Sequence, residues 1–399
     1  MNKKLNIGLF IDTFYPMIDG VVSVVDNYAK RLCKVANVTV FAPKSKNGCS
    51  FDDTSLPYKV VRCKALDLGF IGLDYSLPLP KKDKSFIQAI KDANLDLIHI
   101  HSPFSIGKMG SIYGKKNNIP VIATLHSQYK KDFYKSTHSI LITKAMVRTI
   151  AKTFNRADVL WTMSSGCANL AREYGFTGKA EIIPNATDLI NNFSKAEIHS
   201  FKNEIKAKYN IKDNEKILIN IGRIHKLKNL DFVLDVCKDL KDKHFEFKLL
   251  LIGDGKDKKH FIKRVKKLRL DKNVIFVGRI SDANLKSKFI SISDLHIFPS
   301  SYDTDGIVRI EAAAFSVPTI FIKNSLASST ISENKNGYIG EDNKELFAQK
   351  IIDIFNNDNE YQKVKLNSKN DLYLTWDELM PTIYAKYQNL IKEKKCKTI

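Results

Sequence analysis

Short apolar segments alternate with helical patterns along most of this chain, and no other feature restricts its fold as much. In the first half the strand patterns lie at 5–12, 38–42, 58–63, 95–101, 121–125 and 159–162. The helical patterns between them include 21–34, 105–116 and 137–156. Parallel strands need a long crossover, usually a helix, before the next strand can start. The alternation therefore predicts a parallel α/β sheet.

A second run of the same alternation follows a polar stretch at 185–214 that has no strand signal. Its strand patterns lie at 217–221, 249–252, 274–277, 295–298 and 319–322. A chain of 399 residues also exceeds one ordinary hydrophobic core. We therefore predict two doubly wound, Rossmann-like domains, residues 1–190 and 191–375, and a final helix at 376–394. Ligands of such sheets bind at the carboxyl ends of the strands, so we expect a site in a cleft between the domains.

The segment 300–312 places two carboxylates around a glycine loop at the start of a predicted helix. Asp303 precedes Gly306, the helical pattern begins at Ile307, and Glu311 follows within it. A helix N-terminus offers free N–H groups and the positive end of the helix dipole, which suit phosphate or sugar oxygens. The segment is therefore a candidate binding site.

The acidic triplet 303–305 also has a rival interpretation, because a D-x-D pattern can hold a divalent metal on a nucleotide-sugar diphosphate. That use generally belongs to single-domain transferases with the triplet nearer the N-terminus, whereas here it lies late in the second domain. The six cysteines (33, 49, 63, 167, 237 and 396) form no C-x-x-C pair and are expected to be reduced thiols. We expect no metal and no required cofactor.

Two glycine turns follow strand patterns of the second domain. In the first, Gly222 is followed by Arg223 and Lys228, whose side chains can reach one diphosphate: arginine through a forked contact, lysine as a point charge. A solvated, basic helix start is the alternative. The second turn, Gly253-Asp254-Gly255, is ordinary turn chemistry when taken alone.

Two features of the first domain lie where the expected cleft would be. The loop 13–20 connects the first strand to its helix and ends at Gly20, and His126 follows the strand at 121–125. A plain connection and a structural histidine are the alternatives. We expect His99 to be a core residue, whereas the sequence leaves His101 open.

The net charge of +21 predicts an anionic partner, which could be a nucleic acid, an anionic membrane surface or a phosphorylated substrate. Between residues 111 and 157 there are nine Lys or Arg residues and one acid. Lys144, Arg148, Lys152 and Arg156 recur every four residues and share one helix face. A basic helix with apolar Ile140, Leu141, Ile150 and Phe154 is a membrane-surface candidate, and a solvated charged face is the alternative. No apolar run is long enough for a spanning helix.

Taken together, these motifs resemble the family 4 retaining glycosyltransferases, which have the GT-B fold. The resemblance covers nearly the whole chain and includes the loop ending at Gly20, the His126 strand end, 184–188, 222–228, 253–255, 277–279 and 303–313. It implies two Rossmann-like domains that face a cleft, with the last helix crossing back onto the first domain.

The resemblance also implies roles for single residues. Arg223 and Lys228 would bind the donor diphosphate and stabilise the leaving group, Asp303 would hold sugar hydroxyls, and His126 would contact the sugar. Glu311 would bind the ribose. The other donor-binding positions would be Gly20, Gly222, Gly253, Arg279, Asp305, Gly306 and Ile307, where Asp305 to Ile307 would act through backbone N–H groups. Two positions depart from the family: Asp303 stands where Glu is usual, and Asp19 precedes Gly20 where paired glycines are common.

We expect the protein to transfer a hexose with retention of configuration. The hexose would be glucose from a UDP-linked nucleotide sugar, and the acceptor would lie at the membrane, such as diacylglycerol. The cationic side chains at the diphosphate would stabilise the negative charge that develops on the leaving group, so a metal ion would not be required. The protein would lie at the cytoplasmic face of the cell membrane. One alternative acceptor is a cell-surface or capsular glycan. A nucleic-acid-binding protein is a remote alternative, because no helix-turn-helix, zinc or RRM signature is present, and a non-catalytic relative is another.

Overall fold

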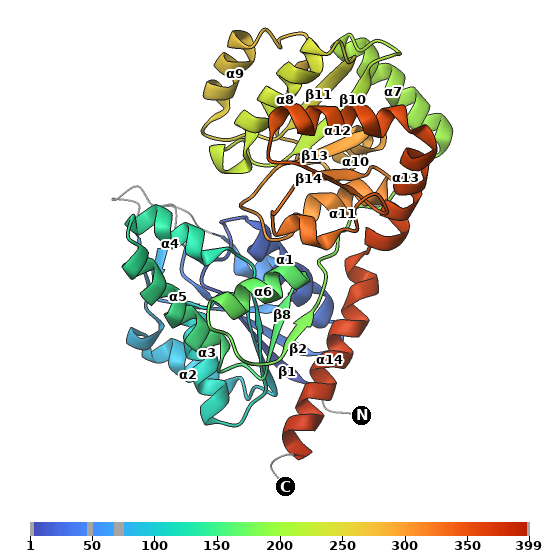
Figure 1. Cartoon of the computed structure of the whole chain (residues 1–399). Helices are drawn as coiled ribbons and strands as arrows, with labels where there is room; N and C mark the ends of the chain where they lie inside the picture. The colour runs from blue at the N-terminus through green and yellow to red at the C-terminus, as the bar shows by residue number, and fades with distance from the viewer. Residues whose placement is uncertain (1–3, 46–50, 68–75, 397–399) are drawn as a thin grey trace. The chain divides into compact units, whose positions relative to one another are not determined.

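The computed structural model describes residues 4–45, 51–67 and 76–396, which form two compact units (Figure 1). The first unit comprises Met1–Pro184 together with Trp376–Ile399, and the second comprises Asn185–Thr375. The chain thus passes between the units slightly before the predicted boundary at 190/191. Cys49, which we expected to be a reduced thiol, lies outside the described residues.

The first unit is built on a seven-stranded parallel sheet in the order β3-β2-β1-β6-β7-β8-β9. Its strands are β1 (Asn6–Phe10), β2 (Asn37–Pro43), β3 (Lys59–Cys63), β6 (Leu97–Ile100), β7 (Val121–Thr124), β8 (Val159–Thr162) and β9 (Ala180–Ile182), and β4 (Ala65–Asp67) pairs antiparallel with β5 (Ser76–Pro78). Its helices are α1 (Gly20–Leu32), α2 (Lys84–Asp92), α3 (Ser105–Lys116), α4 (Tyr129–Thr137), α5 (Ile140–Phe154), α6 (Ser165–Glu173) and α14 (Trp376–Cys396).

The second unit is built on a six-stranded parallel sheet in the order β12-β11-β10-β13-β14-β15. Its strands are β10 (Lys216–Ile221), β11 (Phe247–Ile252), β12 (Val274–Gly278), β13 (Leu295–Phe298), β14 (Thr319–Ile322) and β15 (Tyr338–Gly340). Its helices are α7 (Lys195–Tyr209), α8 (Leu230–Asp242), α9 (Lys258–Lys267), α10 (Ala283–Ser291), α11 (Ile307–Ala314), α12 (Lys344–Asn356) and α13 (Asp358–Leu372).

The prediction of two Rossmann-like parallel sheets is confirmed. The central strands are continuous apolar runs because helices cover both faces of such sheets, and β6, β7, β11 and β13 are buried throughout. The predicted helix at 137–156 corresponds to α5, which begins at Ile140 and ends at Phe154. A separate helix, α4, precedes it and was not predicted; it ends at Thr137, where His138 adopts a left-handed backbone (φ 50°).

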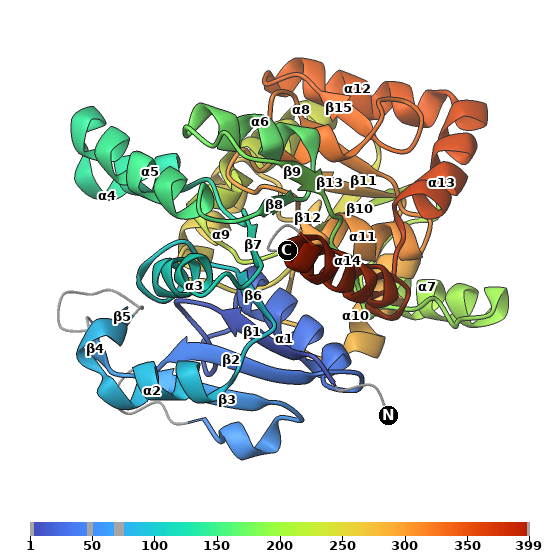
Figure 2. The ribbon, with the colours of Figure 1, turned by 90° about the horizontal axis from the view of Figure 1, so that it is seen from below.

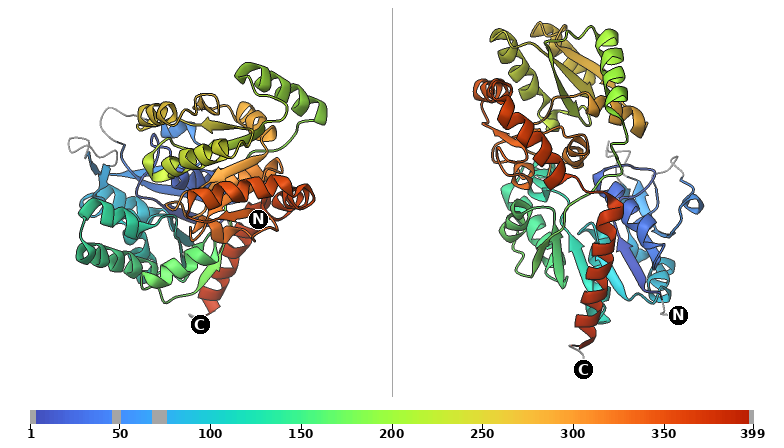
Figure 3. Two further views of the ribbon diagram at one scale, coloured as in Figure 1. Left: turned by 45° about the horizontal axis from the view of Figure 1, so that its top comes forward. Right: turned by 90° about the vertical axis from the view of Figure 1, so that its right-hand side faces the viewer.

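Helix α14 packs on the first unit although it follows the second unit in sequence (Figures 2 and 3). Its Tyr387 ring stacks on Trp161 of β8 at 5.6 Å, and its Trp376 ring meets Tyr28 of α1 at 5.8 Å. Arg31 of α1 pairs with Asp377 at 2.7 Å. Aromatic pairs of this kind add to the free energy gained from burying their area, so α14 is part of the first unit's core.

A buried carboxylate just after β1 gives the fold a pH dependence. Asp12 caps α3, with Ile106 N donating to Oδ1 at 2.7 Å and Gly107 N to Oδ2 at 3.4 Å. Burial nevertheless raises the pKa of Asp12 from 3.8 to about 7. Between these two values the folded chain holds a proton that the unfolded chain has released. Its stabilising effect is therefore complete below about pH 4 and is lost as the pH rises through about 7.

We expect Asp12→Asn to flatten the pH dependence of the free energy of unfolding across this range. One titrating carboxyl can contribute a slope of up to about 1.4 kcal/mol per pH unit. Urea unfolding of both proteins at a series of pH values measures the slope, which separates titration from any constant cost of the weaker cap. Parallel curves for the two proteins would contradict the prediction.

Candidate functional site

Three loops at the carboxyl ends of neighbouring strands β10, β11 and β12 are packed backbone against backbone. Gly222 N donates to Ile252 O, and Gly253 N to Gly278 O, both at 2.9 Å. A Cβ on Gly253 would lie 1.8 Å from Gly222 O, so only glycine fits there. The predicted site residue Gly253 therefore has a packing reason to be glycine, independent of any ligand, whereas a Cβ on Gly222 would meet nothing within 4 Å.

The two predicted cations of the β10 loop differ in their surroundings. Arg223 is exposed and makes no hydrogen bond or ion pair with the described residues. Lys228 lies in the short helix Lys226–Lys228, and its Nζ is 2.6 Å from Oδ1 of Asp303, which follows β13. Strands β10 and β13 are neighbours, and this brings together two predicted residues that are 75 positions apart. Because both partners are partly exposed, such a pair is worth at most about 1 kcal/mol, and an anionic ligand can compete for the lysine.

Asp305 has a structural side chain. Its carboxylate is buried and accepts hydrogen bonds from Arg309 at 2.6 and 3.0 Å and from Asn185 at 2.7 Å. The donor-binding prediction for Asp305 can therefore apply only to its backbone. The metal interpretation of the triplet 303–305 loses one ligand, because this carboxylate is already engaged. Arg309 was not predicted, although its spacing of four residues from Asp305 on one helix was a usable signal.

The loop after β13 ends in a helix N-terminus, as the sequence indicated. Helix α11 begins at Ile307, and Gly306 before it has φ +85° and no side chain to cap the first turn. A Cβ at Gly306 would lie 2.7 Å from Phe298 Cζ. The left-handed backbone and this close contact both favour glycine, and they leave the first N–H groups of α11 without a cap from that residue.

Glu311 is the most buried of the predicted ligand-binding carboxylates after Asp305, at 9% exposure. Its partner is Lys286 of α10, whose Nζ lies 2.6 Å from both Oε1 and Oε2. Lys286 was missed by the sequence analysis, because nothing in the local pattern of α10 predicts a contact with α11. The pair fixes the Glu311 carboxylate in place. Arg279, the remaining predicted residue of this unit, is exposed just after β12.

Gly20 is the first residue of α1 in the other unit. The preceding Asp19 caps the helix, with Oδ1 accepting from Val21 N and Val22 N at 2.9 Å each. This explains the departure from paired glycines, since Asp is a strong N-cap residue. A Cβ built on Gly20 meets nothing within 4 Å. The structure of this unit therefore places no steric demand for glycine here.

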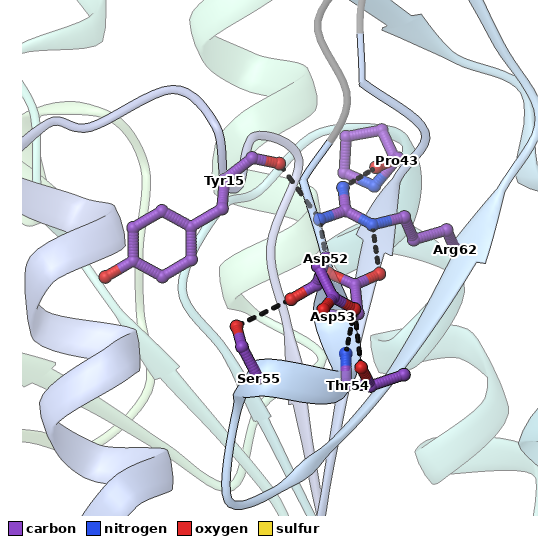
Figure 4. A network of polar contacts seen from close by, with 7 residues as sticks. All are labelled: Tyr15, Pro43, Asp52, Asp53, Thr54, Ser55 and Arg62. Carbon is purple, nitrogen blue, oxygen red and sulfur yellow. Dashed lines mark hydrogen bonds and ion pairs between the residues drawn. The ribbon is translucent and has the colours of Figure 1, made fainter.

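Arg62 of β3 anchors the loop that leads to Gly20 (Figure 4). Its guanidinium binds both carboxylate oxygens of Asp53 at 2.6 and 2.7 Å. The remaining donors reach the backbone, Tyr15 O at 2.9 Å and Pro43 O at 2.8 Å. A forked, charge-assisted contact of this kind is geometrically specific. Arg62 therefore fixes the loop at Tyr15.

Gly20→Ala separates a ligand role from a structural one. The variant should fold with an unchanged melting temperature, because the added methyl has open space. If the loop approaches a sugar donor, the methyl should raise the KM for that donor by about tenfold, equivalent to about 1.4 kcal/mol of lost contact. Steady-state kinetics beside thermal unfolding test this. Unchanged kinetics would remove Gly20 from the site.

His126 lies two residues beyond the end of β7 and is partly buried. Its Nε2 is 3.1 Å from Nδ1 of His101, which follows β6. Burial lowers the pKa of His126 to about 4. The ring is therefore neutral at physiological pH and can offer a hydrogen bond but no positive charge.

Helices α4 and α5 carry an apolar and basic surface. Ile140, Leu141 and Ile142 at the start of α5 are exposed, Leu141 by 80%. Lys144, Arg148 and Lys152 farther along the helix are also exposed. The prediction that Ile150 and Phe154 contribute to this surface is wrong, because both face the core. No helix in the described part of the chain combines the length and apolar character that crossing a membrane requires.

Two family descriptions match the chain: Glycosyltransferase Family 4 over residues 18–190 and Glycosyl transferases group 1 over residues 201–371. Alpha-monoglucosyldiacylglycerol synthase of Streptococcus pneumoniae is 27% identical, over 84% of this chain and 76% of the relative. The protein of the same name from Acholeplasma laidlawii is 25% identical, over 87% of each. The crystal structure of HepE from Anabaena in complex with UDP is similar in fold (TM-score 0.75, 15% identity, 97% of this chain and 100% of that one).

Proposed function

Because the chain belongs to the family 4 glycosyltransferases with the GT-B fold, we propose that it transfers glucose from UDP-glucose to a lipid acceptor, diacylglycerol, with retention of configuration. The main support for a nucleotide-sugar donor is the group of residues at the carboxyl ends of strands β10 and β13. There the exposed Arg223, the Lys228–Asp303 pair at 2.6 Å and the start of α11 lie on neighbouring strands and their following loops.

This edge suits a sugar diphosphate on electrostatic grounds. As the bond from the sugar to the diphosphate breaks, negative charge grows on the departing oxygen and positive charge on the sugar ring. Lys228 and Arg223 would stabilise the diphosphate, and Asp303 would hold the sugar hydroxyls beside it. Donors that are in place before the reaction stabilise such charge without reorganising. Glu311, held by Lys286, would bind the ribose hydroxyls.

Retention follows from a displacement on one face of the sugar. The acceptor hydroxyl oxygen forms the new bond to the anomeric carbon while the bond to the diphosphate breaks on the same side. The departing phosphate oxygen takes the hydroxyl proton, so no enzyme base is required. Among the described residues we find no carboxylate placed as an evident nucleophile, and neutral His126 would contribute a hydrogen bond to the sugar.

The identity of the two substrates is supported by the relatives. The names of the S. pneumoniae and A. laidlawii relatives specify a monoglucosyldiacylglycerol product. HepE from Anabaena, which shares the fold, was crystallised with UDP-glucose. Glucose, a UDP carrier and diacylglycerol are therefore the first substrates to test.

The surface of α4 and α5 supports a membrane location for the acceptor. Exposed Ile140, Leu141 and Ile142 would enter the interfacial region of a bilayer, and the basic side chains of α5 would meet anionic headgroups. We propose that the protein binds the cytoplasmic face of the membrane in this way, where nucleotide sugar is available.

A donor panel tests the function directly. UDP-, GDP- and ADP-sugars are supplied with EDTA, with and without vesicles of anionic lipid and diacylglycerol. We expect transfer from UDP-glucose only when the vesicles are present, and a lipid product of retained configuration by NMR. Transfer that ignores diacylglycerol but requires another glycan would replace the acceptor. Absence of binding and turnover with every donor would overturn the proposal.

A further inference from the structure

Glu311 and Lys286 form an ion pair near the starts of two neighbouring helices of the second unit. Helix α10 follows β12 and helix α11 follows β13, and Lys286 and Glu311 are the fourth and fifth residues of these helices. Helices that start after parallel strands begin at the carboxyl edge of the sheet, where ligands of such folds bind. The pair therefore belongs to the same edge as Lys228 and Asp303, which follow β10 and β13.

Burial makes the Glu311 carboxylate dependent on Lys286. The residue is 9% exposed, and its Oε1 accepts a hydrogen bond from Lys286 Nζ at 2.6 Å. Its Oε2 lies at the same distance from the ammonium group, but it is buried and accepts no hydrogen bond from the described residues. A buried carboxylate is unfavourable unless a cation pairs with it. Lys286 thus compensates this charge and fixes the orientation of the carboxylate.

We propose that Lys286 is a positioning residue that makes Glu311 a selective acceptor for two adjacent hydroxyl groups, so that the protein binds ribonucleotides in preference to 2′-deoxyribonucleotides. The ribose contact of Glu311 rests on the proposed function, and the dependence of that contact on Lys286 is the new step. Lys286 acts through Glu311 and need not touch the nucleotide.

The selectivity follows from the hydrogen-bonding capacity of a carboxylate. An ionised carboxylate only accepts hydrogen bonds, and its two oxygens offer about four lone-pair sites. Lys286 uses part of this capacity and holds the group still, so the remaining sites can meet a pair of neighbouring hydroxyls. A sugar without the 2′-hydroxyl leaves one of these acceptors unpaired, and a site built to bind a hydroxyl discriminates strongly against a ligand that lacks it.

A purely structural role for Lys286 is the alternative, because the pair also joins α10 to α11. A looser junction between these helices would weaken the binding of every nucleotide to the same extent. Positioning has a different signature, since only a nucleotide with both hydroxyls should lose affinity when Lys286 is replaced.

Calorimetric titration with UDP and 2′-deoxy-UDP distinguishes the two roles. We expect the wild type to bind UDP about 10–100-fold more tightly than 2′-deoxy-UDP, as for the loss of a hydrogen bond to a charged group. Lys286→Met keeps the length of the side chain but removes its charge. It should weaken UDP binding about tenfold and change the affinity for 2′-deoxy-UDP by less than about twofold. Lys286→Arg, which keeps the charge, should retain most of the preference.

Lys288→Met is the matched control. Lys288 belongs to the same helix, but its Nζ lies over the Phe201 ring at 4.1 Å, and it forms no ion pair with Glu311. This variant should bind both nucleotides as the wild type does. Thermal unfolding establishes that each variant is folded. A double-mutant cycle with Glu311→Ala completes the test, because Lys286→Met should then weaken UDP binding no further.

The outcomes separate this inference from the proposed function. Equal losses for the two nucleotides in Lys286→Met, or a full additional loss in the double variant, would overturn the role of Lys286 and leave the donor proposal standing. A wild type that binds UDP and 2′-deoxy-UDP equally would do the same. Binding of neither nucleotide to the wild type would overturn the donor proposal, and this inference with it.

Discussion

Arg223→Ala and Lys228→Ala each lower sugar transfer by about 10²–10³-fold while the protein remains folded, the range seen when one preorganised group that stabilises transition-state charge is removed. The loss should appear in kcat, because the charge on the leaving diphosphate develops during the reaction. Arg223 is exposed and makes no hydrogen bond or ion pair with the described residues. Its removal should therefore leave the melting temperature unchanged, and the loss should be purely functional.

Lys228→Ala has one further consequence, because it also removes the ion pair with Asp303 at 2.6 Å. A matched control is Lys226→Ala. Lys226 belongs to the same short helix and is exposed, but its side-chain charge acts on Asp257 and not on Asp303. Steady-state kinetics and thermal unfolding of the three variants give the comparison. If Lys226→Ala reduced transfer as much as the other two, general positive charge rather than these two side chains would be responsible.

Replacing Ile140 and Leu141 together by Asp should abolish most membrane binding. Both side chains are exposed, by 61% and 80%, so the change disturbs little of the fold. Burying one such side chain is worth about 1.5–3 kcal/mol. Losing two should weaken binding to anionic vesicles by at least about 10²-fold, and vesicle sedimentation at low and high salt measures this.

The control for this second prediction is the double change of Leu346 and Leu366 to Asp. These leucines are also exposed, by 56% and 59%, but they lie on α12 and α13 of the other unit. Their replacement adds the same negative charge, so equal loss of binding in both double variants would assign the effect to net charge. Raised salt should weaken binding of the wild type, since exposed charges are screened within about 10 Å at 0.1 M salt.

The sheets could be predicted from sequence because their strands are long apolar runs, and the three-residue edge strands β9 and β15 could not, since such short segments have no period to detect. Helix α7 was also missed within 185–214. Its signal was the capping box of Ser194 and Glu197, which the structure contains in full. Its polar sequence hid the helix because little of it is buried.

The residues of the candidate site also fall into those that the sequence could indicate and those that it could not. Residues at strand ends, such as Arg223 and Asp303, could be proposed from the sequence because local patterns mark loops and helix starts. Their partners could not, since the contacts of Lys286 with Glu311 and of His101 with His126 arise from the order of elements in space. That order is a property of the tertiary structure, and it cannot be predicted from a short stretch of sequence.

The return of α14 to the first unit makes the order of synthesis matter. During synthesis the ribosome adds the whole second unit before residues 376–396. Until then the first sheet lacks helix α14, which supplies Tyr387 and Trp376. During that interval Trp161 lacks its stacking partner and His99 lacks the Tyr387 hydroxyl. The first part of the chain to be made is thus the last to be completed, and a nascent chain that stops before residue 376 exposes an aromatic surface that quality-control proteases and chaperones can recognise.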